Sequence, residues 1–262
     1  MPPKRSTRSL EAKLSRLAEL REAPETAELH GELAKHLTDK SAHVVARAAS
    51  VIETRRIEAL AEDVEGQFDR FTVDPIKLDK GCIAKTAIVA CLASLEHASA
   101  GLFLKGRRHI QLEPSFGGPV DTAVELRCQS AFGLPSTGYP DTVLELTTAL
   151  ADDAYPVRQA AVLALGASSG EGAFELLTSW LDRSFTRSSL TRTVLLAIGM
   201  LRREDAIAFL MNVVTDGPRR RAEDALRALA IHRYDEARSQ RVGSAVAARK
   251  EDDLSKLYEK EF

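Results

Sequence analysis

Apolar residues recur along this chain at the spacing of amphipathic α-helices. The clearest example follows a turn that contains Asp153 and Tyr155, and Pro156 stands near the first position of the expected helix. Proline is tolerated there because the first N–H groups of a helix have no intrahelical acceptor. Four apolar residues of this segment share one helical face: Val157, Ala161, Ala164 and Leu165. The pattern predicts a helix that packs on its neighbours through small and branched side chains.

A second set of amphipathic segments alternates with helices of this kind. Each begins at or near an acidic residue, which favours a helix N-terminus. The clearest are 141–150, 171–181 and 204–214. In addition, Gly133, Gly166 and Gly199 recur at intervals of 33 residues. One helix pair cannot bury its apolar face alone, so a recurrence every ~30–40 residues predicts a solenoid of stacked helix pairs.

The segment Asp-Asp-Ala-Tyr-Pro-Val-Arg-Gln-Ala-Ala-Val-Leu-Ala-Leu-Gly at 152–166 resembles the HEAT-like repeat of the phycobilisome-lyase class. The resemblance implies an A helix, a turn that carries Asp, and a B helix that opens with Val-Arg. It is good over 141–166, looser across 171–233 and weaker over 25–98. We therefore expect an all-α fold, a right-handed α-α solenoid of about six HEAT-like helix pairs with terminal capping helices.

The repeat pattern suggests three regions. Residues 1–24 form a basic N-terminal tail and a capping helix, and residues 235–262 form C-terminal capping helices, because terminal repeats need a polar outer face. Residues 25–234 form the solenoid, with an inserted loop at 99–120 where the repeat lengthens. Within that loop, Glu-Pro-Ser-Phe-Gly-Gly-Pro at 113–119 cannot continue a helix.

Composition and charge narrow the classes of function. Hydrophobic residues make up 44% of the chain and aromatic residues only 5%, which suits packed helices better than a sheet. The formal net charge is -2, whereas a bulk nucleic-acid binder is usually strongly basic. The sequence contains no secretory h-region and no apolar run of the ~18 residues that a membrane span needs. A cytoplasmic protein that does not contact a membrane is the expectation.

Two segments are candidates for binding a partner. Loops on a rigid scaffold often carry binding residues, and the 99–120 insert offers Arg107, Arg108, His109, Gln111 and Phe116. The alternative is that this insert packs down as a plug between repeats. In that case its apolar residues are buried: Leu102, Phe103, Leu104 and Phe116.

The second candidate is a basic segment, since residues 183–233 hold ten arginines against five acidic residues. Arg219, Arg220 and Arg221 open a predicted helix, where positive charge opposes the helix dipole. Such a local misfit is typical of residues that bind a phosphate or an acidic protein. The alternative is a solvated face on which Glu223 and Asp224 pair with these arginines.

Signals for catalysis or metal binding are sparse. The sequence contains no H-E-x-x-H motif, no C-x-x-C pair and no glycine-rich phosphate loop in the required context. Glu32 and His36 are four residues apart but lack an obvious third ligand. The cysteines are expected to be small buried hydrophobes. No cofactor and no metal are therefore expected, and a catalytic activity is not favoured.

These observations favour a non-catalytic protein-interaction scaffold. We expect its partner protein to bind the concave face built by the B helices and the 99–120 insert. Two alternatives remain open at this stage. One is a lyase-like accessory enzyme acting on a bound cofactor or pigment, which the resemblance to the phycobilisome-lyase class suggests. The other is a nucleic-acid-binding protein that uses the 183–233 arginine patch.

Overall fold

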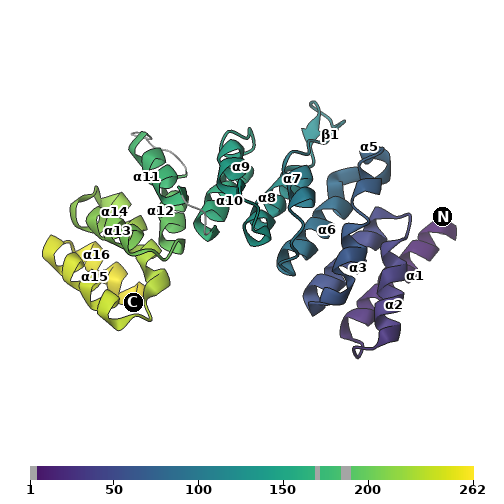
Figure 1. The fold of residues 1–262 in the computed structure, drawn as a ribbon, viewed down its shortest axis with the longest axis horizontal. Coiled ribbons are helices and arrows are strands. Elements are labelled where there is room, and N and C mark those ends of the chain that lie inside the picture. Colours follow the sequence, from purple (N-terminus) through teal and green to yellow (C-terminus); the bar gives the residue numbers. More distant parts are fainter. Residues whose placement is uncertain (1–4, 169–171, 184–189) are drawn as a thin grey trace. The chain divides into compact units, whose positions relative to one another are not determined.

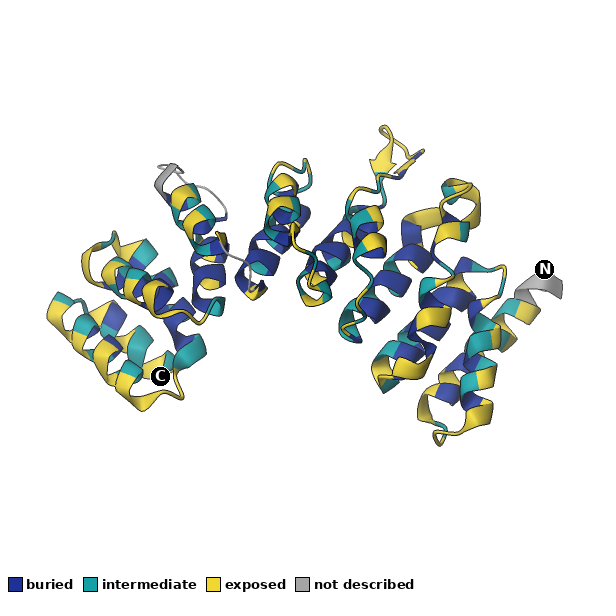
Figure 2. Ribbon diagram, viewed as in Figure 1, coloured by how far each residue is buried: buried dark blue, intermediate teal, exposed yellow. Residues whose placement is uncertain are grey.

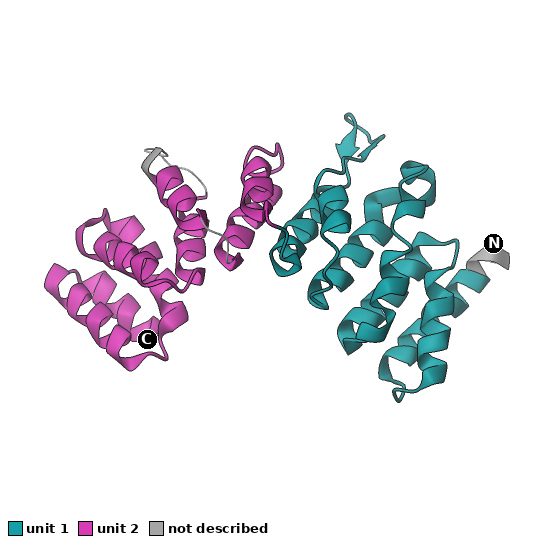
Figure 3. Ribbon diagram, viewed as in Figure 1, with its two compact units in different colours: residues 1–139 teal, residues 140–262 magenta. Residues whose placement is uncertain are grey.

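The computed structural model of this protein describes residues 5–168, 172–183 and 190–262. These residues form sixteen α-helices, joined by short turns, and one two-stranded β-ribbon (Figure 1). The chain divides into two compact units, residues 1–139 and 140–262 (Figure 3). The predicted all-α solenoid fold is confirmed, and each unit is described by itself below.

Unit 1 stacks helices in two rows. One row contains α1, α3, α6 and α8, each packed on the next, and we call these B helices; α2, α4 and α7 pack against them as A helices. The elements of unit 1 are α1 (Arg5–Glu22), α2 (Ala27–Leu37), α3 (Ala42–Arg55), α4 (Ala61–Glu65), α5 (Pro75–Leu78), α6 (Ile83–Ser94), α7 (Ala100–Arg107), β1 (Leu112–Glu113), β2 (Val120–Asp121) and α8 (Val124–Gly133).

Unit 2 repeats this arrangement. Its B helices α10, α12, α14 and α16 pack in succession, and each has its own A helix, namely α9, α11, α13 and α15. The bounds are α9 (Thr142–Ala149), α10 (Tyr155–Ala167), α11 (Ala173–Arg183), α12 (Thr191–Met200), α13 (Glu204–Asp216), α14 (Arg219–Leu229), α15 (Glu236–Arg249) and α16 (Asp252–Glu261). Across the described residues, six A–B pairs therefore precede the α15–α16 pair, in agreement with the expected number of repeats.

The two kinds of helix differ in how much of their surface they bury. Helix α2 buries a single stripe, Leu29, Leu33 and Leu37, at intervals of four residues. Helix α3 is buried on most of its circumference, because α1, α2 and α6 all pack against it (Figure 2). Its buried residues are Ala42, Val44, Val45, Ala46, Ala48, Ala49, Val51 and Ile52. Alanine-rich B helices thus form the interior of each unit.

The periodic glycines allow the B helices to approach closely. A Cβ at residue 166 would lie 2.5 Å from the carbonyl oxygen of Ala197, and a Cβ at residue 199 would lie 2.7 Å from that of Ala228. Both distances are too short for a real contact, so only glycine fits where α10 meets α12 and where α12 meets α14. The 33-residue interval seen in the sequence reflects this repeated contact in unit 2.

Arginine side chains close several helix ends. Arg55 donates to the backbone oxygens of Leu20, Arg21 and Ala23 after α1. Arg70 does the same after α2, and Arg249 after α13. The last carbonyl groups of a helix lack intrahelical donors, and they carry the negative end of the helix dipole. These arginines therefore stabilise the turns between helices.

The segment 99–120 is not the single inserted loop that the sequence suggested. Residues Ala100–Arg107 form α7, which is the A helix of α8 and packs on it. Helix α7 buries Leu102 and Phe103, which explains why those apolar residues are present. The irregular part is confined to the residues after α7, where β1 and β2 pair as a ribbon. The long repeat is a normal helix pair plus this ribbon.

Candidate binding surface

The β-ribbon is short and projects from the connection between α7 and α8 (Figure 1). Leu112 pairs with Asp121, and Glu113 pairs with Val120, in antiparallel register. The turn between the strands contains Gly117 and Gly118, both with positive φ, a conformation that glycine adopts without strain. Side chains alternate along β1, so that Leu112 is exposed while Glu113 is buried.

A buried polar network holds the base of the ribbon. The carboxylate of Glu113 accepts hydrogen bonds from the backbone N–H of Gly81 at 2.6 Å, from Gln111 at 2.7 Å and from Thr122 at 2.9 Å. The Gln111 amide also donates to the backbone oxygen of Asp79 at 2.9 Å. The ribbon is thereby fastened to the turn that precedes α6.

That turn is itself fixed by a buried ion pair. Asp79 and Lys85 are both fully buried, and the Lys85 Nζ lies 2.9 Å from the Asp79 carboxylate. Asp79 also accepts from the backbone N–H groups of Ala84 and Lys85 in the first turn of α6. The Lys85 ammonium donates additionally to the backbone oxygen of Phe71. Both charges therefore have partners inside the protein, as buried charges require.

A second ion pair anchors the other strand. Asp121 lies 2.7 Å from Arg127 of α8, and Arg127 also donates to the backbone oxygen of His109. Asp121 accepts from the backbone N–H groups of Gln111 and Ala123 as well. One strand of the ribbon is thus attached to the turn before α6, and the other strand to α8.

The carboxylates of the network are held in their charged forms. Burial opposes ionisation of Glu113, but the hydrogen bonds from Gly81, Gln111 and Thr122 outweigh it, so the pKa of Glu113 is below its usual value. The pKa of Asp121 is lowered in the same way, since donors from Ala123 and Arg127 outweigh its burial. The pKa of His109 is lowered by burial, which the contact with Gln111 only partly offsets.

Large apolar side chains are exposed around this network. Among the described residues, eight of the twelve exposed large hydrophobic residues lie between Val73 and Val120. We call these eight residues of two segments the apolar patch: Val73, Ile76, Leu78, Ile83, Ile110, Leu112, Phe116 and Val120. Within the ribbon, Leu112 and Val120 face opposite sides, because Val120 pairs with Glu113. Phe116, at the tip of the ribbon, is fully exposed. The patch follows two segments, one around α5 and one in the ribbon, that the hydrogen bonds at Asp79 and Gly81 join.

The predicted contact residues of the 99–120 segment differ in how far they are exposed to solvent. Arg107 is half-buried, Arg108 is exposed, and both already have an interaction partner within the protein. His109 is half-buried, with its ring 3.4 Å from Gln111. Gln111 is buried and belongs to the network, so its role is to position the ribbon. The alternative that the insert packs down as a plug predicted buried apolar side chains. Leu102 and Phe103 are buried as it predicted, whereas Phe116 is fully exposed.

The sequence analysis did not identify the residues that support the ribbon. Lys85 gave the strongest signal, because it is a single charge within the apolar run from Ile83 to Leu92. A lone charge on a helix that is otherwise buried requires a buried partner. Glu113 gave no signal of its own, since its donors come from residues distant in the sequence.

The arginine cluster of unit 2 is partly neutralised. Arg219 lies 3.3 Å from Glu223, one turn along α14, and also pairs with Asp253 of α16. The pairing alternative is therefore confirmed for Arg219. Arg220 is exposed, Arg221 is half-buried, and neither side chain makes an ion pair or hydrogen bond with another described residue. Arg187, within the predicted 183–233 patch, lies outside the described residues.

Other arginines of the same patch are also paired. Arg192 and Arg227 both contact Asp224, at 3.8 Å and 3.2 Å, and Arg203 lies 2.7 Å from Asp205. Because these guanidinium groups face carboxylates, the local positive charge is smaller than the residue count suggests.

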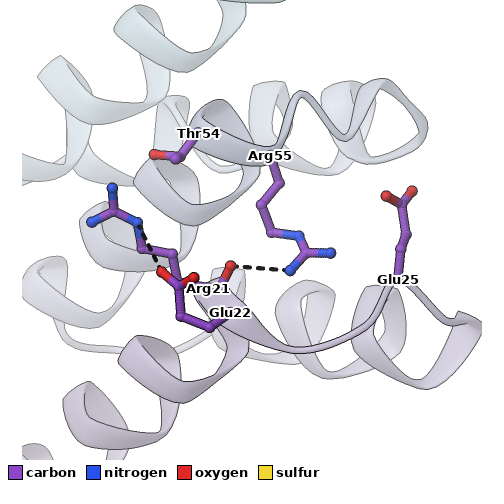
Figure 4. A pocket seen from close by; sticks show the side chains of 5 residues that line it. All are labelled: Arg21, Glu22, Glu25, Thr54 and Arg55. Carbon is purple, nitrogen blue, oxygen red and sulfur yellow. Dashed lines mark hydrogen bonds and ion pairs between the residues drawn. The ribbon is translucent and has the colours of Figure 1, made fainter.

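A surface depression lies where the connection after α1 meets the end of α3 (Figure 4). It is lined by Arg21, Glu22, Glu25, Thr54 and Arg55. Its polar character comes from the Arg55 guanidinium, which donates to the backbone oxygens described above, and from the Arg21–Glu22 ion pair. Among the groups that line it, Arg55 closes the end of α1.

Reactive and metal-binding groups do not converge elsewhere. The part of the chain that the structure describes contains no group of three or more His, Cys, Asp or Glu side chains able to hold a metal ion. His36 lies 3.9 Å from Glu32, and burial lowers the pKa of His36. All three cysteines are buried, and burial raises the pKa of Cys82 to about 11 and that of Cys91 to about 12. Thiols of this kind are poor nucleophiles.

The stacked A–B pairs define an α-solenoid, and the comparison with protein families gives the repeat type. Residues 120–190 match the family described as HEAT repeats. This part of the chain is therefore similar to HEAT repeats, and the resemblance to the phycobilisome-lyase class stays a prediction. A search of curated proteins found no similar sequence. Within the described residues, no helix has both the length and the apolar character needed to cross a membrane.

Proposed function

We propose that this chain is a non-catalytic protein-interaction scaffold. Its partner protein binds the face formed by the B helices and the 99–120 segment, where the β-ribbon is the main anchor. HEAT repeats generally serve as protein-interaction scaffolds, and the match to residues 120–190 supports the general class. The exposed Phe116 on a rigidly fastened ribbon is the single observation that carries the more specific proposal.

The energetics of interfaces explain why this observation matters. A solvent-exposed phenylalanine gains free energy when a partner covers it, and aromatic anchors dominate many protein interfaces. A flexible loop would lose conformational entropy on binding, which weakens the complex. The ribbon avoids much of this loss, because Glu113 and Asp121 fix its two strands before any partner arrives.

The B helices of unit 1 supply a second surface. Each exposes or half-buries a stripe at helical positions i, i+4 and i+7. The stripes are His43, Arg47 and Ser50 on α3, Ile83, Ala87 and Ala90 on α6, and Glu125, Gln129 and Phe132 on α8. We call these residues the helix-B face. It includes an exposed aromatic residue, Phe132, and aromatic residues are enriched in protein interfaces.

Site-specific photo-crosslinking tests the proposal. A benzoylphenylalanine replaces Phe116 at the ribbon tip, Phe132 on the helix-B face, or Tyr234 as a control. Tyr234 is an exposed aromatic residue of unit 2 that belongs to neither surface. After illumination in an extract of the source cells, the proteins carrying the label at 116 and 132 should form an adduct with the same polypeptide. The protein labelled at 234 should not form that adduct.

The proposal fails if the label at 116 yields no adduct beyond those formed at 234. Adducts at 234 alone would move the binding surface to unit 2.

A further inference from the structure

We infer that the apolar patch binds an acidic segment of the partner, one that combines large apolar side chains with aspartate or glutamate. This inference rests on the proposed function and names the chemistry of the ligand. It follows from two observations, the clustering of exposed apolar residues and the way in which the surrounding charges are distributed between the interior and the surface.

The first observation concerns shape and support. The two segments of the patch cannot separate without breaking the hydrogen bonds from Gln111 to Asp79 and from Gly81 to Glu113. The patch therefore offers exposed apolar side chains on two segments that these hydrogen bonds join. Apolar patches of this kind on soluble proteins commonly mark interaction sites.

The second observation concerns charge. The acidic groups at the junction are engaged inside the protein, Asp79 with Lys85, Glu113 with the ribbon donors and Asp121 with Arg127. The neighbouring lysine side chains, in contrast, are exposed to solvent. The side chains of Lys77 and Lys80 are exposed and form no ion pair or hydrogen bond with any other described residue.

The surface of the α5 segment therefore carries more positive than negative charge. Asp74 is the exposed acidic residue there, against Lys77 and Lys80. Lys80 lies close enough to the ribbon to favour the charged form of Glu113. A partner with acidic residues beside apolar ones would complement this surface, whereas a basic partner would be repelled. Complementary charge of this kind selects partners and increases the rate of association.

Selection from a random peptide library tests the inference. The full-length protein is immobilised and exposed to short random peptides displayed on phage, and the bound pool is sequenced. We expect enrichment of peptides in which Phe, Leu, Ile or Trp stands beside Asp or Glu. One enriched peptide is then synthesised, and its dissociation constant is measured by fluorescence anisotropy.

Variants of exposed residues locate the site. Phe116→Ser, and the double charge reversal Lys77→Glu with Lys80→Glu, should each weaken binding of that peptide about tenfold or more. Lys260→Glu is the control, because Lys260 is an exposed lysine of unit 2 that belongs to neither segment of the patch. It should bind the peptide as the unaltered protein does. Circular dichroism and thermal melting should be unchanged in all three proteins, since the altered side chains are exposed.

The inference is overturned if the enriched peptides are basic or lack acidic residues, if no peptides are enriched, or if the charge reversal leaves their affinity unchanged. These outcomes differ from failure of the proposed function. If the label at residue 116 captures a partner while the peptide pool is not acidic, the scaffold function stands and only the chemistry of its ligand is wrong. If the label captures nothing, the scaffold function fails.

Discussion

At the scale of single residues, glycine controls the distance between successive B helices of unit 2. Gly166 and Gly199 stand where the backbone of the next B helix leaves no room for a methyl group. Other helical glycines have no such neighbour. Gly31 of α2 has no atom of another side chain or helix within 4 Å of the position where a Cβ would lie. Glycine therefore fits best at residues 166 and 199, whereas at residue 31 it makes the protein less stable than alanine would.

Replacing these glycines by alanine should have opposite effects. Gly166→Ala forces α10 and α12 apart, and overpacking of this kind costs about 1–3 kcal/mol. Gly31→Ala should raise stability by about 0.5–1 kcal/mol, because alanine has less backbone freedom to lose in a helix. Thermal melting of the two variants beside the unaltered protein measures both effects. An unchanged melting temperature for Gly166→Ala would show that the helices have space to spare.

The buried Lys85 is a second residue whose effect should be large. Lys85→Met removes the ammonium that faces Asp79 and leaves a buried carboxylate without its ion pair. Breaking a buried ion pair by removing one partner costs about 3–5 kcal/mol. Lys80→Met, at the exposed neighbouring lysine, is the control and should change stability by less than about 0.5 kcal/mol. Urea unfolding of both variants gives the comparison, and similar losses of stability would contradict the assigned role of the ion pair.

At the scale of elements, the ribbon illustrates how far the sequence can be interpreted. The prolines and glycines of 113–119 indicated correctly that no helix continues there. The helix before them was missed, since α7 is only eight residues long and contains two glycines that weaken helical propensity. Its stability comes from packing Leu102 and Phe103 against neighbours, and such tertiary contacts have no local signature.

The binding residues were harder to predict than the helices. Phe116 was selected as a possible contact at a loop tip, and its exposure agrees with that selection. Gln111 was selected on the same grounds but is buried, because strand alternation turns it and Glu113 inward. The direction of a side chain in so short a ribbon depends on the hydrogen bonds to Asp79 and Gly81, which lie more than thirty residues away in the sequence.

The ribbon should be sensitive to acid. The pKa of Glu113 is lowered in the folded protein, so its contribution to stability is present above the usual value of 4.5 and is lost as the pH falls below it. Glu113→Gln should therefore be less stable than the unaltered protein at about pH 7, and the difference should be smaller at about pH 3, because the stabilising contribution of the carboxylate declines as the pH falls below 4.5. Thermal melting at the two pH values tests this.

A control separates this effect from general acid denaturation. Glu62→Gln changes an exposed carboxylate on α4, and its melting temperature should equal that of the unaltered protein at both pH values. A difference between Glu113→Gln and the unaltered protein that stays constant with pH would show that the charge of Glu113 does not hold the ribbon.

At the scale of the whole molecule, the repeat architecture was the most predictable feature. Apolar periodicity, the recurring glycines and the Pro-Val-Arg segment all point to stacked helix pairs, and residues 120–190 match HEAT repeats. Repeat packing is local, because each B helix contacts mainly its own A helix and the neighbouring B helices. Local packing leaves a regular pattern in the sequence, whereas a binding surface assembled from α5 and the ribbon does not.

This architecture also explains why a ribbon can serve as the binding element. Stacked helix pairs form a rigid framework, and a segment attached to it by buried hydrogen bonds keeps one conformation. The helices of unit 1 need their apolar faces for packing on one another, so the exposed apolar side chains gather on α5 and on the ribbon. In the proposed scaffold, the residues that stabilise the fold are therefore separate from those that we propose to bind.

The most direct test of this account is the affinity for the partner that the label at residue 116 captures. The dissociation constant is measured for the unaltered protein, for Phe116→Ser and for Tyr234→Ser. We predict about tenfold or weaker binding for Phe116→Ser, because a central aromatic anchor is lost, and unchanged binding for Tyr234→Ser. Equal affinity for all three proteins would contradict the claim that the ribbon is where this scaffold binds.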